Sequence, residues 1–126
     1  MTLHVLGYDA SDSRVELFPG DVAVGVAGKQ MYTLLGSCIA VILTDPKRTI
    51  GAMCHIVHVR TPPVAERANT AYGEVAMARM FRELGARGFA PNRCQAFVYG
   101  GGNMFPNLNL KAAVGDRNGA WVMDFL

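Results

Sequence analysis

The sequence predicts one α+β domain, a sandwich of mainly antiparallel or mixed β-sheets flanked by helices. The chain has 126 residues, which suits a single domain at about 100–200 residues per domain. Hydrophobic residues make up 51% and charged residues 17%, enough apolar surface to bury a core. Short apolar runs between turn signals predict strands, and one segment between them has the periodicity of a helix. We expect one domain over residues 1–126, with 1–13 as a flexible N-terminus.

Short strands are predicted where branched or alternating apolar residues run between glycine, proline and aspartate turn signals. These strands are expected over residues 14–18, 21–25, 38–43, 50–59 and 94–99. The turn signal at residues 45–48 is short, so the two buried strands on either side of it are expected to form an antiparallel pair.

One helix is expected after a loop at residues 60–69 that contains two prolines. Asn69 or Thr70 can cap its N-terminus, and Gly85 and Gly88 offer C-terminal stops. Its core-facing stripe, at positions i, i+3, i+4 and i+7, consists of Met77, Met80, Phe81 and Leu84.

The glycines at residues 100–102 follow the last predicted strand. No helix with P-loop spacing and a lysine follows them, so we expect a tight turn rather than a phosphate cradle. A second helix is expected over residues 116–126, with Trp121, Val122 and Phe125 on one side. Since it reaches the last residue without a cap, we interpret the C-terminal part as missing and expect a homo-oligomer that covers this side.

The charge balance argues against a protein that binds nucleic acid or a membrane surface. There are 12 Lys and Arg and 10 Asp and Glu residues, a net charge of +2, which is too weak an excess to attract a polyanion. No apolar run approaches the roughly 20 residues that span a bilayer, and the N-terminus lacks the regions of a signal peptide. We expect a cytoplasmic protein that neither binds nucleic acid nor inserts into a membrane.

The three cysteines are Cys38, Cys54 and Cys94. An odd number without an export signal indicates reduced thiols rather than a disulfide scaffold. No Cys-x-x-Cys pair exists, and the three histidines are too few and too badly spaced for a zinc finger. We therefore expect no metal and no cofactor, and we expect Cys54 and Cys94 to pack in the core inside strands.

The strongest local signal for chemistry is Cys38, which follows Gly36 and Ser37 where a loop becomes a buried strand. Backbone N–H groups can converge on an oxyanion at such a junction. In an antiparallel pair Cys38 can lie opposite His55, and the two could form a thiolate–imidazolium couple. The alternative is a buried cysteine that only packs. His58 has the wrong strand parity to share a face with His55 and is expected in solvent or a loop.

Five motifs in one order resemble the CheD family of chemoreceptor glutamine deamidases, from about Arg14 to Leu126. They are Leu-Phe-Pro-Gly-Asp-Val-Ala-Val-Gly at 17–25, Leu-Leu-Gly-Ser-Cys at 34–38 with Ile-Gly-Ala-Met-Cys-His at 50–55, Tyr-Gly-Glu-Val-Ala-Met at 72–77, Tyr-Gly-Gly-Gly-Asn-Met-Phe at 99–105 and Val-Gly-Asp-Arg-Asn at 114–118. The sequence departs from the family at residues 58–62, His-Val-Arg-Thr-Pro, where the family has an apolar loop with proline. The family also continues with further strands beyond the helix expected at 116–126.

The resemblance implies a cysteine hydrolase that converts glutamine side chains to glutamate in the coiled-coil region of a chemoreceptor, without a cofactor. Carried over residue by residue, Cys38 is the nucleophile, His55 the general acid and base, and Thr33 the third member, which would orient the His55 ring. The oxyanion and substrate-groove positions would be Gly36, Ser37, Gly101, Gly102 and Asn103.

Two other functions stay open from the sequence. One is a docking module without turnover, which binds a CheC-type phosphatase or a receptor helix; the resemblance implies that family members bind such partners. The other is a thiol hydrolase on the same fold with a different substrate.

Overall fold

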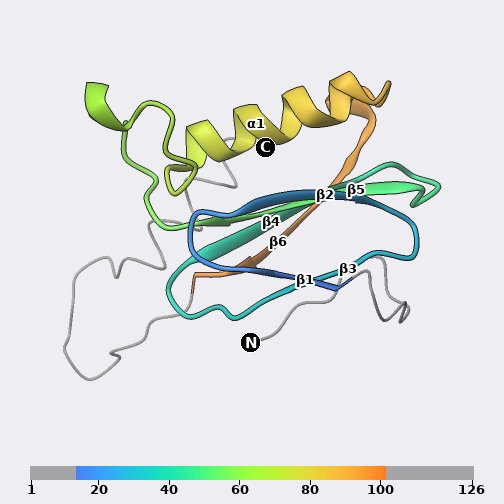
Figure 1. Cartoon of the computed structure of the whole chain (residues 1–126), viewed down its shortest axis with the longest axis horizontal. Coiled ribbons are helices and arrows are strands. Elements are labelled where there is room, and N and C mark those ends of the chain that lie inside the picture. The colour runs from blue at the N-terminus through green and yellow to red at the C-terminus, as the bar shows by residue number, and fades with distance from the viewer. Residues whose placement is uncertain (1–13, 102–126) are drawn as a thin grey trace.

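The computed structural model of the chain describes residues 14–101 (Figure 1). Its main elements in chain order are β1 (Arg14–Leu17), β2 (Val22–Val26), β3 (Gln30–Thr33), β4 (Ile39–Thr44), β5 (Ile50–Ile56), α1 (Gly73–Ala86) and β6 (Gln95–Gly100). Short 3₁₀ turns lie at Val64–Glu66 and Pro91–Arg93. The prediction for a helix at residues 116–126 falls outside the described residues, as do Gly102, Asn103 and residues 1–13.

The architecture has three layers (Figure 1). The middle layer is a four-stranded antiparallel sheet in the order β2-β5-β4-β6. Helix α1 lies on one face of it, and β1 and β3, which pair in parallel, lie on the other. The α+β class with a mainly antiparallel sheet is confirmed. Within residues 14–101 one face of the sheet carries helix α1, and the other carries the two-stranded ribbon of β1 and β3.

Strands β4 and β5 form the centre of the sheet and are buried along their whole length. The antiparallel pair predicted from the short turn is confirmed, with Ile39 opposite Ile56 and Thr44 opposite Gly51. The Asp45 carboxylate fixes this turn, because it accepts hydrogen bonds from the N–H groups of Thr49 and Ile50 at 2.7 and 3.0 Å.

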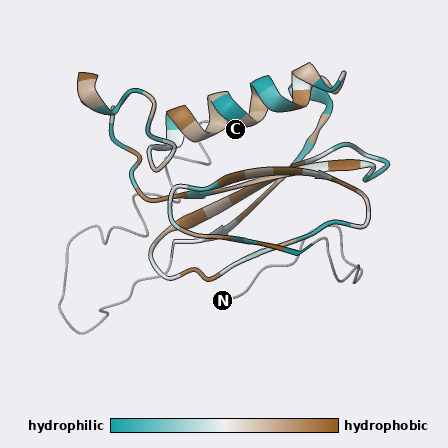
Figure 2. Ribbon diagram, viewed as in Figure 1, coloured by the Kyte–Doolittle hydropathy of each residue, from teal (hydrophilic) through white to brown (hydrophobic). Residues whose placement is uncertain are grey.

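Apolar residues run along this central pair, as the brown segments in Figure 2 show, and they build two separate cores. Side chains of alternate residues point to opposite faces of a strand. Cys54 and Ile56 therefore pack with the helix, in the cluster that holds Met77 and Met80. Met53 packs on the other side, in the cluster beneath β1 and β3. The prediction that Cys54 packs in the core is confirmed.

Helix α1 begins at Gly73, with Tyr72 as its N-cap residue and no side-chain cap. The predicted cap at Asn69 or Thr70 was wrong, because both side chains are used earlier in the loop. Asn69 Oδ1 accepts the Ala71 N–H at 2.9 Å, and the Thr70 hydroxyl donates to the backbone oxygen of Gly20. The predicted apolar stripe lies on the sheet, and the stop at Gly88 is confirmed, because this residue follows the helix with φ of +83°. The stop predicted at Gly85 was wrong, since Gly85 lies inside the helix.

Two further features differ from the sequence-based expectation. No strand was predicted at β3, which belongs to a different sheet from β4, the next strand in the chain. Cys94 lies one residue before β6 rather than inside a strand, although it still packs against the helix-side core. Among residues 14–101, no helix is long and apolar enough to cross a bilayer.

Candidate active site

His55 lies near the end of β5, opposite Ala40 of β4. Its neighbours Cys54 and Ile56 point toward α1, so the alternation of the strand turns His55 toward β1 and β3. There its side chain is 3% exposed. A histidine so deeply buried needs hydrogen-bond partners for its ring nitrogens.

Thr33, at the end of β3, supplies the partner for one of those nitrogens. Its Oγ1 lies 2.8 Å from His55 Nδ1 and 2.6 Å from the backbone oxygen of Leu17. A hydroxyl has one proton, and a carbonyl oxygen can only accept, so Thr33 donates to Leu17. The threonine oxygen must then accept from Nδ1–H. This hydrogen-bond chain assigns the ring proton of neutral His55 to Nδ1.

The second ring nitrogen, Nε2, therefore carries the free lone pair. It is buried and has no hydrogen-bond partner among the described residues. A buried nitrogen with an unused lone pair is the basic atom that a proton-transfer step requires. Orientation of one ring nitrogen by a hydrogen bond, which leaves the other free, is how proteins select the tautomer of a histidine base.

The backbone of His55 is held by the turn that joins β1 to β2. The Gly20 N–H donates to the His55 oxygen at 2.9 Å, and the His55 N–H donates to the Asp21 oxygen at 3.1 Å. The turn is closed by Asp21, whose N–H donates to the Phe18 oxygen and whose carboxylate accepts the Phe18 N–H at 2.8 Å. Pro19 and Gly20, with φ of +90° at the glycine, suit the two central positions of a type II turn.

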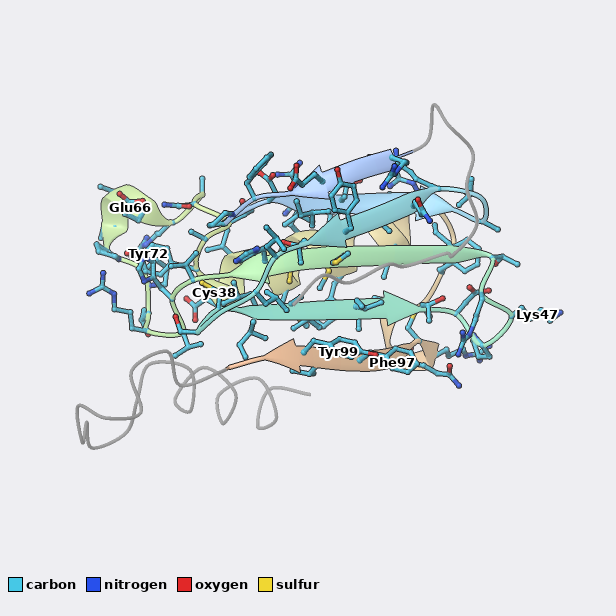
Figure 3. The ribbon with its side chains drawn as sticks, turned by 90° about the horizontal axis from the view of Figure 1, so that it is seen from below. Cys38, Lys47, Glu66, Tyr72, Phe97 and Tyr99 are labelled. Atoms are coloured by element: carbon cyan, nitrogen blue, oxygen red, sulfur yellow. The ribbon has the colours of Figure 1, made fainter. Side chains whose placement is uncertain are left out.

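Cys38 is half-buried and stands immediately before β4. Figure 3 places it at the start of this strand, beside the end of β5. If the β4–β5 register is extended by one residue, Cys38 lies diagonal to His55 on the same sheet face, a relation that separates Cα atoms by about 7–8 Å. No hydrogen bond joins its Sγ to Nε2; in unliganded enzymes such contacts are often long and shorten when substrate binds.

Burial sets both groups toward their uncharged forms. It raises the pKa of the Cys38 thiol. It also lowers the pKa of His55, an effect that the nearby negative charge of Asp21 partly opposes. Both shifts favour a thiol and a neutral imidazole as the resting forms.

The glycine turn after β6 holds the carbonyl group of Cys38. The Gly101 N–H donates to the Cys38 oxygen at 3.0 Å. Gly100 has a φ of +101°, and a Cβ at this position would overlap the same oxygen. Gly100 is the last residue of β6, and the tight turn expected at residues 100–102 extends beyond the described residues. Because the Gly101 amide is already used, it is not a free donor for an oxyanion.

The structure brings together only part of the predicted set. Thr33 contacts His55 directly, and Gly36 and Ser37 lie in the bend between β3 and β4, next to Cys38. His58 is in the loop after β5, where its ring packs on Tyr72 with the ring centroids 4.8 Å apart. The catalytic roles of these residues stay predictions.

Sequence reasoning missed two supports of the site, the Leu17 carbonyl group and Asp21. The role of the Leu17 carbonyl group could not be predicted from the sequence, because every residue has a backbone oxygen. Asp21 belongs to the Pro-Gly-Asp turn signal, and only the pairing of this turn with β5 connects it to His55.

An α+β domain with a cysteine near a buried, hydroxyl-oriented histidine has the groups that a cysteine-dependent hydrolase uses. The family described as "CheD chemotactic sensory transduction" matches residues 60–126. The chain belongs to this family.

Curated relatives extend the similarity over most of the chain. This chain is 38% identical to a probable chemoreceptor glutamine deamidase CheD 2 of Albidiferax ferrireducens, over 87% of its own length and 66% of the relative. It is 33% identical to a probable chemoreceptor glutamine deamidase CheD 1 of Shewanella oneidensis, over 90% and 56%. A relative of the same name from Methanosarcina mazei is 34% identical over 93% and 55%. The chain thus spans between 55% and 66% of the length of these three proteins.

Proposed function

We propose that this protein is a chemotaxis enzyme of the cytoplasm that hydrolyses glutamine side chains of chemoreceptors to glutamate. The observation that carries the proposal is the hydrogen-bond chain from Leu17 through Thr33 to His55, with the buried Nε2 left free near Cys38. The names of the relatives supply the substrate class.

In the first step His55 Nε2 takes the Cys38 proton as the sulfur attacks the carbon of the glutamine side-chain amide. Resting neutral forms suit this order, because a desolvated thiolate without substrate would be costly. The developing imidazolium is stabilised by Thr33 at Nδ1–H and by the charge of Asp21. Backbone N–H groups near Gly36, Ser37 and Cys38 are the proposed oxyanion donors.

In the second step the imidazolium returns its proton to the departing nitrogen, and ammonia leaves a thioester on Cys38. Water, deprotonated by His55 Nε2, then attacks the thioester carbon. The C–S bond breaks, the thiol is restored and the receptor side chain becomes a glutamate. No step requires a metal or a redox partner.

The test is incubation of the full chain with a receptor cytoplasmic fragment, scored by mass. Each converted glutamine adds about 1 Da and releases one ammonia. Cys38→Ala should abolish the mass change, whereas Cys94→Ala, a matched change at a half-buried thiol near another end of the sheet, should keep it. If Cys38→Ala turned over within about tenfold of the parent rate, Cys38 could not be the nucleophile.

A docking function without turnover is the second candidate, with a CheC-type phosphatase or a receptor helix as partner. The observation that favours it is the resting state of Cys38, whose raised pKa and missing contact to Nε2 both leave the thiol unactivated. Binding of the receptor fragment together with an unchanged fragment mass would select this candidate.

A further inference from the structure

Helix α1 has a second face that the core does not use. Four residues at i, i+3, i+4 and i+7, offset from the buried stripe, line an open groove against the loop at residues 61–70. They are Val75, Ala78, Arg79 and Arg82. The groove has a volume of about 740 Å³, within the range of about 300–1,000 Å³ that ligand sites occupy. It lies on the helix side of the sheet, away from Thr33 and the His55 ring.

The lining of this groove is strongly basic. Arg67, Arg79 and Arg82 line it together with one carboxylate, Glu74, a formal charge of +3 − 1 = +2. This equals the net charge of the whole chain, so the weak overall excess hides a local concentration. None of the three arginines forms an ion pair within residues 14–101; the ion pair on this helix joins Arg87 to Glu83 at 2.8 Å.

The shape of the groove favours a protein segment over a small ion. Arg79 and Arg82 are three residues apart on one helix, which places their Cβ atoms about 5–6 Å from each other. That spacing suits two carboxylates one helical turn apart on a partner. Pro62 and Val75 add apolar surface to the lining, which a solvated inorganic anion would not use but an aliphatic side chain would.

The groove and Cys38 lie at the same end of the molecule. Strand β5 ends at Ile56, opposite the first residue of β4, and the chain then runs directly into the loop that lines the groove. In Figure 3, Cys38, Tyr72 and Glu66 lie together at this end, and Lys47 lies at the other. A protein bound at Cys38 therefore has this loop beside it.

We propose that this arginine groove docks an acidic, helical segment of the protein substrate while a neighbouring glutamine occupies Cys38. The inference rests on the proposed function and adds the chemistry by which the substrate is recognised: two carboxylates one turn apart, flanked by an apolar side chain. The groove then contributes to KM and leaves kcat unchanged, because it does not touch the reacting atoms.

The test uses the double variant Arg79→Glu/Arg82→Glu of the full chain. Its matched control is Lys47→Glu/Arg93→Glu, which makes the same charge change at two exposed positions outside the groove. With the receptor cytoplasmic fragment, the groove variant should raise KM about tenfold at unchanged kcat, and the control should stay within about twofold. The parent KM should also rise from about 0.1 M to about 1 M salt, as the Debye length falls from about 10 to about 3 Å.

Binding measured in the Cys38→Ala background keeps this proposal separate from the function. If the fragment binds there and the groove variant weakens binding about tenfold, the docking proposal holds whether or not the parent turns over. Equal binding by the groove variant and the control would overturn it, and so would absence of binding to the parent. If the groove variant bound inorganic phosphate more weakly but bound the fragment as well as the control does, the groove would be a site for a small anion. That result would also overturn the proposal.

Discussion

Thr33 has one hydroxyl proton, and the Leu17 carbonyl takes it. This small fact decides which nitrogen of His55 is the base, because the threonine oxygen then has only lone pairs to offer Nδ1–H. Thr33 and His55 are both buried, so a water molecule cannot replace the threonine hydroxyl as the hydrogen-bond partner of Nδ1. The tautomer follows from the hydrogen-bond count and needs no charge on any group.

Removal of the Thr33 hydroxyl should therefore impair the proposed reaction more than it impairs folding. Thr33→Val leaves the Nδ1–H and the Leu17 oxygen unsatisfied, at a cost of about 1–3 kcal/mol in unfolding free energy. The ring is then free to protonate at Nε2, and kcat should fall about 10²-fold or more. Thr33→Ser, which keeps the hydroxyl, is the control and should stay within about tenfold. Equal kcat for the two variants would contradict the assigned tautomer.

The thiols should differ in reactivity according to their surroundings. Burial raises the pKa of Cys38, which is half-buried, and raises that of Cys54, which is fully buried, to about 12. Iodoacetamide reacts with the thiolate. In the free protein, labelling of Cys38 should thus be slow near neutral pH and should accelerate in the alkaline range, while Cys54 stays unlabelled until the chain is unfolded.

Peptide mass mapping of the labelled sites across pH checks this order. Fast labelling of Cys38 at neutral pH without substrate would show a preformed thiolate–imidazolium couple. The resting forms inferred from burial would then be wrong.

At the scale of elements, the site is assembled by turns rather than by the strands alone. The turn after β1 holds both backbone groups of His55, and the Thr70 hydroxyl ties the loop before α1 to the same turn. On the other side, the turn after β6 holds the Cys38 carbonyl through Gly101. The two proposed reacting residues are thus fixed from opposite edges of the central sheet.

Gly100→Ala should test how tightly the second turn is packed. The added methyl group would overlap the Cys38 oxygen, and φ is +101°. We expect a loss of more than about 1–3 kcal/mol in unfolding free energy, or a displaced Cys38 backbone. Gly88→Ala is the matched control, because its φ of +83° is similarly strained but nothing lies within 4 Å of the added carbon. Urea denaturation of both variants separates the overlap from the strain, and equal losses would show that no overlap exists.

At the scale of the whole molecule, burial of His55 couples stability to pH. The fold lowers the pKa of this group, first through burial, with Asp21 in opposition. The unfolded chain, with an ordinary pKa of about 6.5, therefore binds a proton more readily than the folded chain. Stability from this group is complete above about pH 6.5 and is lost as pH falls toward the folded pKa.

The urea midpoint should accordingly decrease between about pH 7.5 and about pH 5.5. His55→Gln should flatten this decrease, whatever its effect on absolute stability. His58→Gln is the control for loss of a histidine outside the site, since His58 lies in the loop beside Tyr72. An unchanged slope in His55→Gln would place the coupling elsewhere.

The class of fold and most of the local elements could be inferred from the sequence. The central hairpin and the helix stripe were predictable because period, turn residues and branched side chains act over a few neighbours. Motif order identified the family, and it brought Thr33 into consideration beside Cys38 and His55.

The contacts between distant segments of the chain could be identified only in the folded protein. The parallel pairing of β1 with β3, which puts Thr33 against His55 and Leu17, joins strands that no turn connects directly. The support of His55 by the turn at Asp21 likewise depends on contacts between segments far apart in the chain. Such contacts leave no periodic signal, because their free energy comes from burial and hydrogen bonding between surfaces that form only when the layers pack.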